Sequence, residues 1–220
     1  MKKYLSRFSS WRWQLAQWAE WRWWRWYLKH KHPEEYLLAK SAYWNRFLDQ
    51  CGVWLPPGAA VLDAGCGPAG IFIACPDQQV TAVDPLLPLY AQHLTHFRPE
   101  AYPKVHFIAS PLENLELQPD FQWVFCLNAI NHTRDPHRAL ESMCAAMQPG
   151  ATLVLSTDTH KYPVLQWIFQ VLPGDILHPQ QLHRRDYEQL LHRNGLNIHS
   201  VFVAKKGLIF DYTVFIAGLD

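Results

Sequence analysis

The sequence is poor in cysteine, the residue that forms disulfide crosslinks and many zinc sites. Its five cysteines are odd in number and scattered, without the paired spacing of a zinc site. No apolar run reaches the ~18–20 residues that cross a bilayer, and the first residues lack a signal-peptide pattern. We therefore expect reduced thiols, no disulfide, no bound metal and a cytoplasmic protein.

An excess of charge of one sign is also lacking. Charged residues make up 18% of the chain and the formal net charge is +1, so the bulk charge gives no drive toward nucleic acid. Hydrophobic residues make up 49%, which fits a globular protein, and 220 residues are enough for one domain with a cap. A nucleic-acid partner is therefore disfavoured.

Tryptophan, in contrast, is abundant and unevenly placed: of 11 in the chain, seven lie between Trp11 and Trp26. Residues 5–30 contain no Gly or Pro, which predicts a helix capped by Ser9 or Ser10. At about 100° per residue, this helix has a basic stripe and an aromatic face on the opposite arc. The stripe holds Arg22, Arg25 and Lys29, and the aromatic face holds Trp23, Trp24, Trp26 and Tyr27. Such a helix can pack as a cap on the domain, lie peripherally on an anionic membrane surface, or join two copies in a homodimer.

A second helix is predicted from Pro33 to about Gln50. Pro33 and the two glutamates that follow it suit a first helical turn, and apolar residues continue at helical spacing. The turn Pro56-Pro57-Gly58 then leads into a strand. We interpret residues 1–50 as an N-terminal Trp-rich helical cap and residues 51–220 as the main domain.

The main domain is organised around the segment Val61–Gly70. A short apolar run is followed by Gly65, Gly67 and Gly70, in the G-x-G-x-x-G spacing of a nucleotide-binding turn. Asp63 precedes these glycines, and a carboxylate there would repel a dinucleotide pyrophosphate. It suits a ligand that carries an ammonium group, such as S-adenosylmethionine (SAM). A plain strand-to-helix turn and an NAD-binding turn are the alternatives.

These residues resemble the first motif, D-x-G-x-G-x-G or close to it, of the class I SAM-dependent methyltransferases. The motif stands here as Asp63-Ala64-Gly65-Cys66-Gly67-Pro68-Ala69-Gly70, and the resemblance covers roughly Gly52 to the C-terminus. It implies an α/β, Rossmann-like, doubly wound sheet of seven strands, mostly parallel, with an antiparallel C-terminal hairpin. It also implies SAM as cofactor and S-adenosylhomocysteine as product, with Asp63, Ala64, Gly65 and Gly67 at the cofactor.

A second carboxylate, Asp84, follows the next predicted strand. It lies 19 residues after Gly65, close to the ~20 at which such folds place an acid that binds ribose hydroxyls. A carboxylate suits this role because it accepts from both vicinal hydroxyls at once. The resemblance implies that Asp84 and Pro85 bind the adenosine of SAM, with a plain helix cap as the alternative.

The segments after the next two predicted strands complete the implied cofactor site. The family commonly has an acid for the adenine amino group where this chain has Pro111, so this contact falls to Ser110, Leu112 or Glu113. Asn128 follows the strand over residues 121–127, and the resemblance implies that it meets the methionine part of the cofactor. Earlier in the chain, between Asp84 and the next predicted strand, a helix over residues 86–98 is predicted to expose His93 and His96.

Three histidines are candidates for a general base, because histidine titrates near neutral pH. His132 corresponds to a histidine common in the family, and a purely structural role is its alternative. His160 and His178 lie in an unusually long connection over residues 157–179, after a strand predicted at 152–156. Asp158 at the start of this connection could orient one histidine or hold an amine substrate.

The resemblance implies that the connection over residues 157–179 is a substrate lid and that the second helix also covers the cofactor. The candidate substrate contacts are Tyr36, Lys40, Tyr43, Trp44 and Trp167. Core packing is the alternative for each. Aromatic faces suit an apolar or a cationic small molecule.

The leading hypothesis is a SAM-dependent methyltransferase that acts on a small apolar, aromatic or amine acceptor, in the cytoplasm or at a membrane surface. A SAM-binding regulatory subunit without catalysis is the second hypothesis, because the family acid at Pro111 is missing. Nucleic-acid methylation is the third and weakest, because no N-P-P-[YF] motif follows the fourth strand.

Overall fold

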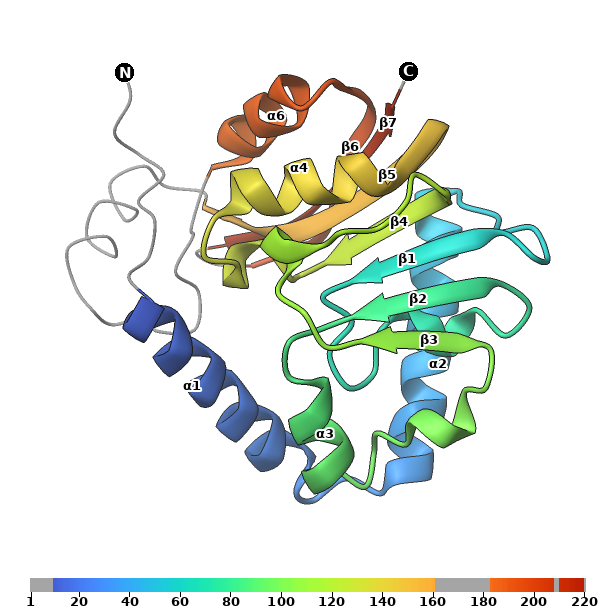
Figure 1. Ribbon diagram of the computed structural model, residues 1–220, viewed down its shortest axis with the longest axis vertical. Helices are drawn as coiled ribbons and strands as arrows, with labels where there is room; N and C mark the ends of the chain where they lie inside the picture. Colours follow the sequence, from blue (N-terminus) through green and yellow to red (C-terminus); the bar gives the residue numbers. More distant parts are fainter. Residues whose placement is uncertain (1–9, 161–182, 208–209, 220) are drawn as a thin grey trace.

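The computed structural model describes residues 10–160, 183–207 and 210–219. They form a seven-stranded sheet in the order β3-β2-β1-β4-β5-β7-β6, with helices on both faces (Figure 1). The five strands β3, β2, β1, β4 and β5 run parallel to one another. Strand β7 is antiparallel to both β5 and β6. The predicted Rossmann-like, doubly wound sheet with an antiparallel C-terminal pair is therefore confirmed.

Two helices begin the described chain, and the strands that follow are separated by helices or 3₁₀ turns, except for the consecutive strands β6 and β7. The strands are β1 (Ala60–Ala64), β2 (Gln79–Val83), β3 (Val105–Ile108), β4 (Phe121–Leu127), β5 (Met147–His160), β6 (Leu196–Lys206) and β7 (Phe210–Leu219). The α-helices are α1 (Ser10–Leu28), α2 (Pro33–Cys51), α3 (Leu87–His93), α4 (Pro136–Ala146) and α6 (Arg184–Arg193). Short 3₁₀ turns span Ile71–Ala74, Pro99–Ala101, Leu112–Asn114 and Ile130–His132.

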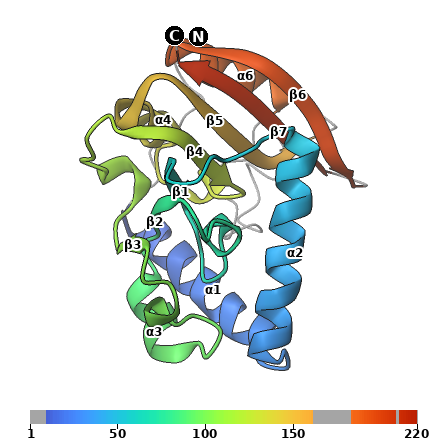
Figure 2. The ribbon, with the colours of Figure 1, turned by 90° about the vertical axis from the view of Figure 1, so that its right-hand side faces the viewer.

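Alternation along the central strands divides the core into two layers, because successive strand residues point to opposite faces of the sheet. Under α4 and α6 lie Leu62, Val124, Leu153 and Phe215. Under α2 and α3 lie Val61, Phe125, Val154 and Val214. All eight are fully buried, as expected of parallel strands covered on both faces. Figure 2 shows α2 along one face of the sheet, opposite α4 and α6.

Helix α1 lies beyond the carboxyl ends of β1 and β2, at the edge where open α/β sheets bind ligands (Figure 1). Its last turn is anchored, because Leu28 is buried and the Trp24 ring packs edge-on against Tyr90 of α3. The inner face of the helix is therefore a cap on the domain. Within the three described ranges, no helix combines the length and the apolarity needed to cross a bilayer.

Two elements differ from the sequence-based expectation. Strand β5 was expected only over residues 152–156, but it continues to His160, because β7 pairs with it as far as the register His160↔Phe210. The first four residues of the expected lid are therefore strand, and residues 161–179 lie outside the described part of the chain.

Helix α3 ends at His93 rather than near residue 98, and the expectation that His96 is exposed is wrong. The chain leaves the helix in order to bury Leu94, His96 and Phe97. His96 Nε2 lies 2.9 Å from the carbonyl oxygen of Lys31, in the turn between α1 and α2. This contact ties the helical cap to the main domain. His93 is exposed, as expected.

Gly65 and Gly58 form a matched pair for testing how tightly the turn after β1 is packed. Both have φ +78°, so an alanine at either position suffers the same backbone strain of roughly 1–2 kcal/mol. A Cβ on Gly58 would meet open space, whereas a Cβ on Gly65 would overlap the side chain of Ala129. We expect Gly65→Ala to lower the free energy of unfolding by about 1–3 kcal/mol more than Gly58→Ala does. Urea unfolding measures both, and equal losses would contradict the packing described here.

Candidate functional site

A cavity of about 740 Å³ lies at the carboxyl ends of the strands, between the loops after β1–β4 and the two N-terminal helices. Its floor includes Gly65, Cys66, Gly67, Ala69, Asp84, Pro85, Pro111, Leu112, Glu113, Leu127, Asn128, Ala129, His132 and Thr133. Helices α1 and α2 form its roof and one wall. Asp158, Ala204, Lys205 and Tyr212 close the remaining side. The cavity therefore sits where doubly wound sheets bind ligands.

The turn after β1 is tied to the end of β2 by backbone hydrogen bonds. The Val83 carbonyl accepts from the N–H groups of Gly65 at 2.7 Å and Cys66 at 3.0 Å. The N–H of Gly67 donates to Asp84 Oδ2 at 3.0 Å. Across the cavity the Trp24 indole lies over Gly67, within 3.5 Å of the position a Cβ would take. A Cβ there would be in ordinary van der Waals contact with the indole, so it is the left-handed φ of +56° that favours glycine at 67.

Asp84 lines the cavity and is otherwise almost fully buried. Besides the bond from Gly67, its Oδ1 accepts from the N–H of Leu86 at 2.8 Å. Burial raises the pKa of Asp84 to about 6, and the two backbone donors counteract part of this effect. Each carboxylate oxygen has further lone pairs for a pair of ligand hydroxyls.

Asp63 and Ala64 do not line the cavity. The Asp63 carboxylate lies behind the glycine turn, where its Oδ2 accepts from the N–H of Phe72 at 3.1 Å. Burial raises the pKa of Asp63 to about 7, and the negative charge of Asp84 acts in the same direction. The structure thus places the two acids on opposite sides of the turn, so that Asp63 supports the turn and Asp84 faces the cavity.

Pro111 and Leu112 line the cavity beyond Asp84, as predicted for the adenine end. Glu113 also borders it, but its Oε1 accepts from the backbone N–H groups of Arg134 at 2.6 Å and Asp135 at 3.0 Å. This carboxylate therefore fixes the start of α4. Of the adenine candidates, the Leu112 segment remains the one that is open to a ligand.

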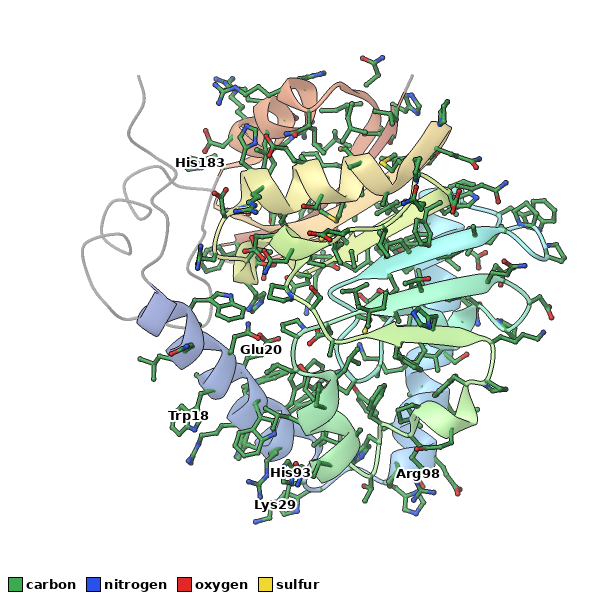
Figure 3. The ribbon with its side chains drawn as sticks, viewed as in Figure 1. Trp18, Glu20, Lys29, His93, Arg98 and His183 are labelled. Carbon is green, nitrogen blue, oxygen red and sulfur yellow. The ribbon has the colours of Figure 1, made fainter. Side chains whose placement is uncertain are left out.

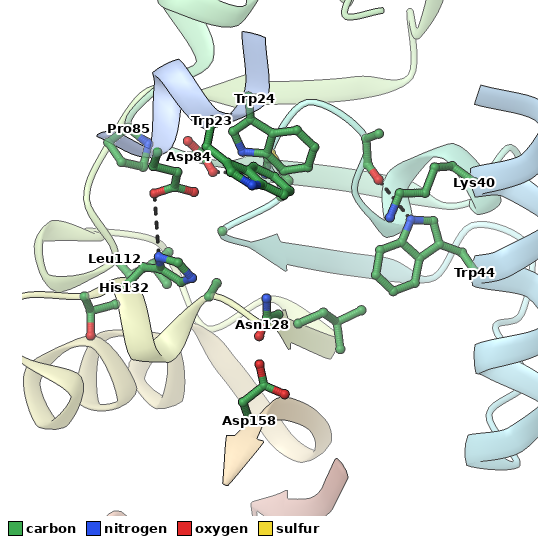
Figure 4. Close-up of a pocket in the computed structure, with 18 of the residues that line it drawn as sticks. Trp23, Trp24, Lys40, Trp44, Asp84, Pro85, Leu112, Asn128, His132 and Asp158 are labelled. Carbon is green, nitrogen blue, oxygen red and sulfur yellow. Dashed lines mark hydrogen bonds and ion pairs between the residues drawn. The ribbon is translucent and has the colours of Figure 1, made fainter. Parts of the chain in front are cut away.

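Asn128 follows β4 with φ 54°, a left-handed conformation that asparagine adopts more readily than most residues. Its N–H donates to the Ser156 carbonyl at 2.8 Å, which couples the end of β4 to β5. Asn128 and Asp158 of β5 both line the cavity and lie on the same side of it (Figure 4). The predicted methionine-end residue is thus brought into the same cavity as Asp84.

His132 lines the cavity and faces Glu20 of α1, with 3.8 Å between His132 Nδ1 and Glu20 Oε2. Both side chains are about one-fifth exposed. Burial raises the pKa of Glu20 to about 8, the charge of Asp84 adds to the rise, and a hydrogen bond from Trp24 counteracts it. The sequence analysis missed Glu20, because no motif marks it.

The residues of α1 that line the cavity share one face of the helix. Trp13, Gln17, Glu20, Trp24 and Tyr27 recur at intervals of three and four residues and all line the cavity. The predicted separation of α1 into a basic stripe and an opposite aromatic face was partly wrong. Trp26 is 72% exposed and lies on the outer face with the basic stripe. On this outer face the Arg22 guanidinium lies over the Trp18 ring and the Arg25 guanidinium over the Trp21 ring, each pair being four residues apart.

Helix α2 brings four of the predicted substrate contacts to the cavity, namely Tyr36, Lys40, Tyr43 and Trp44. Trp44 Nε1 donates to the Ala69 carbonyl at 3.0 Å, which fixes α2 against the glycine turn (Figure 4). Lys40 Nζ lies 4.9 Å from the Trp44 ring centroid, and burial lowers its pKa. The Lys40 cation therefore stands over aromatic rings in the cavity wall.

Three predicted site residues cannot be placed relative to the cavity from the described part of the chain. The backbone of His160 ends β5, while Trp167 and His178 lie outside the described residues. Among the described residues, no group of three or more His, Cys, Asp or Glu side chains could hold a metal ion. Cys66 lines the cavity as a free thiol, and burial together with Asp63 and Asp84 raises its pKa well above the ordinary value.

The residues present fit a nucleoside that carries an amino acid. Asp84 offers oxygens for ribose hydroxyls, beside an apolar Pro111–Leu112 surface suited to a flat base. Two cavity residues carry buried polar atoms, Gln17 Oε1 and Tyr36 Oη, that have no hydrogen-bond partner among the described residues. Buried polar atoms are normally satisfied, so both point to a polar ligand.

Comparison with known proteins agrees with this geometry. Residues 30–201 match the family model described as a methyltransferase domain. A tRNA U34 carboxymethyltransferase from Syntrophotalea carbinolica is 32% identical over 104 residues, covering 46% of this chain and 32% of that protein. A ubiquinone biosynthesis O-methyltransferase from Xanthomonas campestris pv. campestris is 34% identical over 106 residues, covering 46% of this chain and 44% of that protein. The chain thus aligns with less than half the length of either relative.

Among solved structures, geranyl diphosphate C-methyltransferase from Streptomyces coelicolor A3(2), in complex with Mg²⁺, geranyl-S-thiolodiphosphate and S-adenosyl-L-homocysteine, has a TM-score of 0.63. The match covers 82% of this chain and 76% of that one at 16% identity, so it shows a shared fold. Since the family model spans more than half of the residues, the chain belongs to the methyltransferase-domain family and has the class I SAM-dependent methyltransferase fold.

Proposed function

We propose that this protein transfers the methyl group of SAM to a small apolar or aromatic acceptor held beneath helices α1 and α2. One observation carries the proposal: a single cavity joins Asp84, the glycine turn and Asn128 to a roof and wall of aromatic rings. At about 740 Å³ it falls within the ~300–1,000 Å³ of small-molecule pockets.

Different residues of the floor would bind the ribose, the adenine and the methionine part of the cofactor. Asp84 would accept from the ribose hydroxyls, and Leu112 would lie against the adenine. The backbone of Gly65–Gly67 and Asn128 would meet the methionine part. When bound, SAM supplies an electrophilic methyl group on a positively charged sulfur.

The acceptor would lie against the aromatic part of the wall. Eight rings of α1 and α2 line the cavity: Trp13, Trp23, Trp24, Tyr27, Tyr36, Tyr43, Trp44 and Phe47. Such a wall excludes water and orients a flat or apolar acceptor by stacking. Holding two reactants in line can lower a barrier by ~7–11 kcal/mol, which is the main contribution we assign to the chain. The similarity to a ubiquinone biosynthesis O-methyltransferase supports oxygen as the methylated atom.

His132 would act as the general base for a hydroxyl acceptor. Its imidazole takes the hydroxyl proton while the acceptor oxygen bonds to the methyl carbon, and the bond from sulfur to that carbon breaks with its electron pair left on sulfur. Glu20 is a positioning residue in this scheme, because its carboxyl group lies 3.8 Å from His132 Nδ1.

Methyl-labelled SAM tests the activity. We expect the wild-type protein to transfer label from SAM to an organic-extractable compound in a metabolite extract, and His132→Ala to lower the rate ~10²–10⁴-fold. His137→Ala is the matched control, because His137 lies on α4 outside the cavity and pairs with Glu141. No transfer by the wild-type protein, or equal rates for the two variants, would contradict the proposal.

Calorimetry with SAM tests the cofactor site independently of any acceptor. Asp84→Asn keeps the shape of the side chain but weakens its acceptance from two hydroxyls, so we expect the dissociation constant to rise ~10- to 100-fold. Asp77→Asn removes the same charge at an exposed site outside the cavity, where Asp77 pairs loosely with Lys104, and should leave affinity within about twofold. Equal effects would exclude Asp84 as a ligand.

The raised pKa values predict how SAM affinity depends on pH. A cationic ligand favours ionised carboxylates, so binding lowers the pKa of Asp84 and Glu20 and releases protons. Affinity should therefore rise roughly tenfold as pH increases from about 6 to about 8, through the two raised pKa values of the free protein. Glu20→Gln should remove the upper part of this dependence. A flat profile in calorimetric titrations of the wild-type protein would contradict the described burial of these acids.

A further inference from the structure

Helix α1 has a second face, on the side away from the cavity. Leu15, Trp18, Arg22, Arg25, Trp26 and Lys29 are all exposed there. Trp18 is 51% exposed and Trp26 72%, so two indoles stand in solvent beside the cations. Figure 3 shows Trp18 on the outer side of the helix and Glu20 on the side toward the domain. This outer face has no acidic residue, because Glu20 is the only acid of α1.

The cations of the outer face lie along a groove between the second half of α1 and the segment that follows α3. The groove has a volume of about 520 Å³ and is lined by Arg22, Arg25, Trp26, Leu28, Lys29, Lys31, His93, Leu94, Thr95 and His96. Four of these residues are Lys or Arg and none is Asp or Glu. A groove of this composition suits an anion that several donors can reach at once.

Aromatic rings hold three of the four cations in place. Arg22 lies 4.8 Å from the Trp18 ring centroid, and Arg25 lies 5.1 Å from that of Trp21. Lys31 Nζ lies 4.5 Å from the Tyr27 ring centroid. In the part of the chain that the structure describes, no carboxylate forms an ion pair with any of the four. Among the described residues, no negative charge therefore neutralises these four cations.

We propose that the outer face of α1 and its groove dock on the surface of an anionic lipid bilayer. Lipid phosphates would enter the groove, while Trp18 and Trp26 would rest at the level of the headgroups. Trp suits this level because one side of its ring is apolar and its N–H is polar. A row of cations interleaved with exposed indoles on one helix face is typical of helices that lie in a membrane interface. The inference goes beyond the proposed function and does not depend on it.

Docking in this orientation would set the cavity beside the bilayer. The same helix that meets the lipid with its outer face supplies Trp13, Glu20, Trp24 and Tyr27 to the cavity with its inner face. An apolar ligand could then pass between the membrane and the cavity along α1 without crossing bulk water.

Vesicle sedimentation of the whole protein, without SAM, tests the docking. We expect binding to vesicles of phosphatidylglycerol mixed with phosphatidylcholine and none to phosphatidylcholine alone. The triple variant Arg22→Glu, Arg25→Glu, Lys29→Glu should lower partitioning more than about tenfold, because each cation near an anionic surface contributes to binding. The double variant Trp18→Ala, Trp26→Ala should weaken it by about tenfold.

The matched control reverses three other exposed cations, in Arg46→Glu, Lys104→Glu and Arg193→Glu, and should partition as the wild-type protein does. Circular dichroism and SAM calorimetry confirm that each variant is folded. Equal losses for the two triple variants, or no binding to the mixed vesicles, would overturn the proposal. Competition by inorganic phosphate without vesicle binding would assign the groove to a free anion instead. Self-association that the α1 variants abolish, again without vesicle binding, would assign the face to a second copy of the chain.

Discussion

The site depends on how two buried carboxylates are accommodated around one glycine turn. Asp63 accepts from the Phe72 N–H behind the turn, and Asp84 accepts from the Gly67 and Leu86 N–H groups in front of it. Burying an acid without such donors is costly, so each acid fixes the backbone that solvates it. The turn cannot move away from the end of β2 without leaving a buried carboxyl group unpaired, and this keeps the floor of the cavity in place.

Much of the main domain could be predicted from local sequence. The apolar strands, the glycine spacing and Asp84 depend on residues that are close together along the chain. Gly65, Gly67 and Asp84 line the cavity, whereas Asp63 and Ala64 lie behind the turn. The extent of β5 could not be predicted in this way, because the pairing partner of His160 is Phe210, 50 residues later in the chain. His96 was misplaced for the same reason, since its partner is the carbonyl of Lys31.

The sequence predicted most of the residues in the floor of the cavity, but fewer of the residues that α1 contributes to its roof. Glu20 meets His132 only because α1 lies across the carboxyl edge of the sheet in one particular rotation. Periodicity identifies the two faces of a helix, but it does not say which face meets the domain when both are rich in tryptophan. The packing of Leu28 and of Trp24 against Tyr90 decides this, and it also leaves Trp26 in solvent.

The buried thiol in the floor has a chemical consequence for a protein that holds a methylating agent. A thiolate is a far stronger nucleophile than a thiol, and Cys66 lies in the floor of the cavity in which SAM is proposed to bind. Burial and the negative charges of Asp63 and Asp84 keep Cys66 protonated at physiological pH. The same two acids that shape the floor thereby protect the chain from alkylating itself, and leave the substrate as the nucleophile that the electrophile encounters.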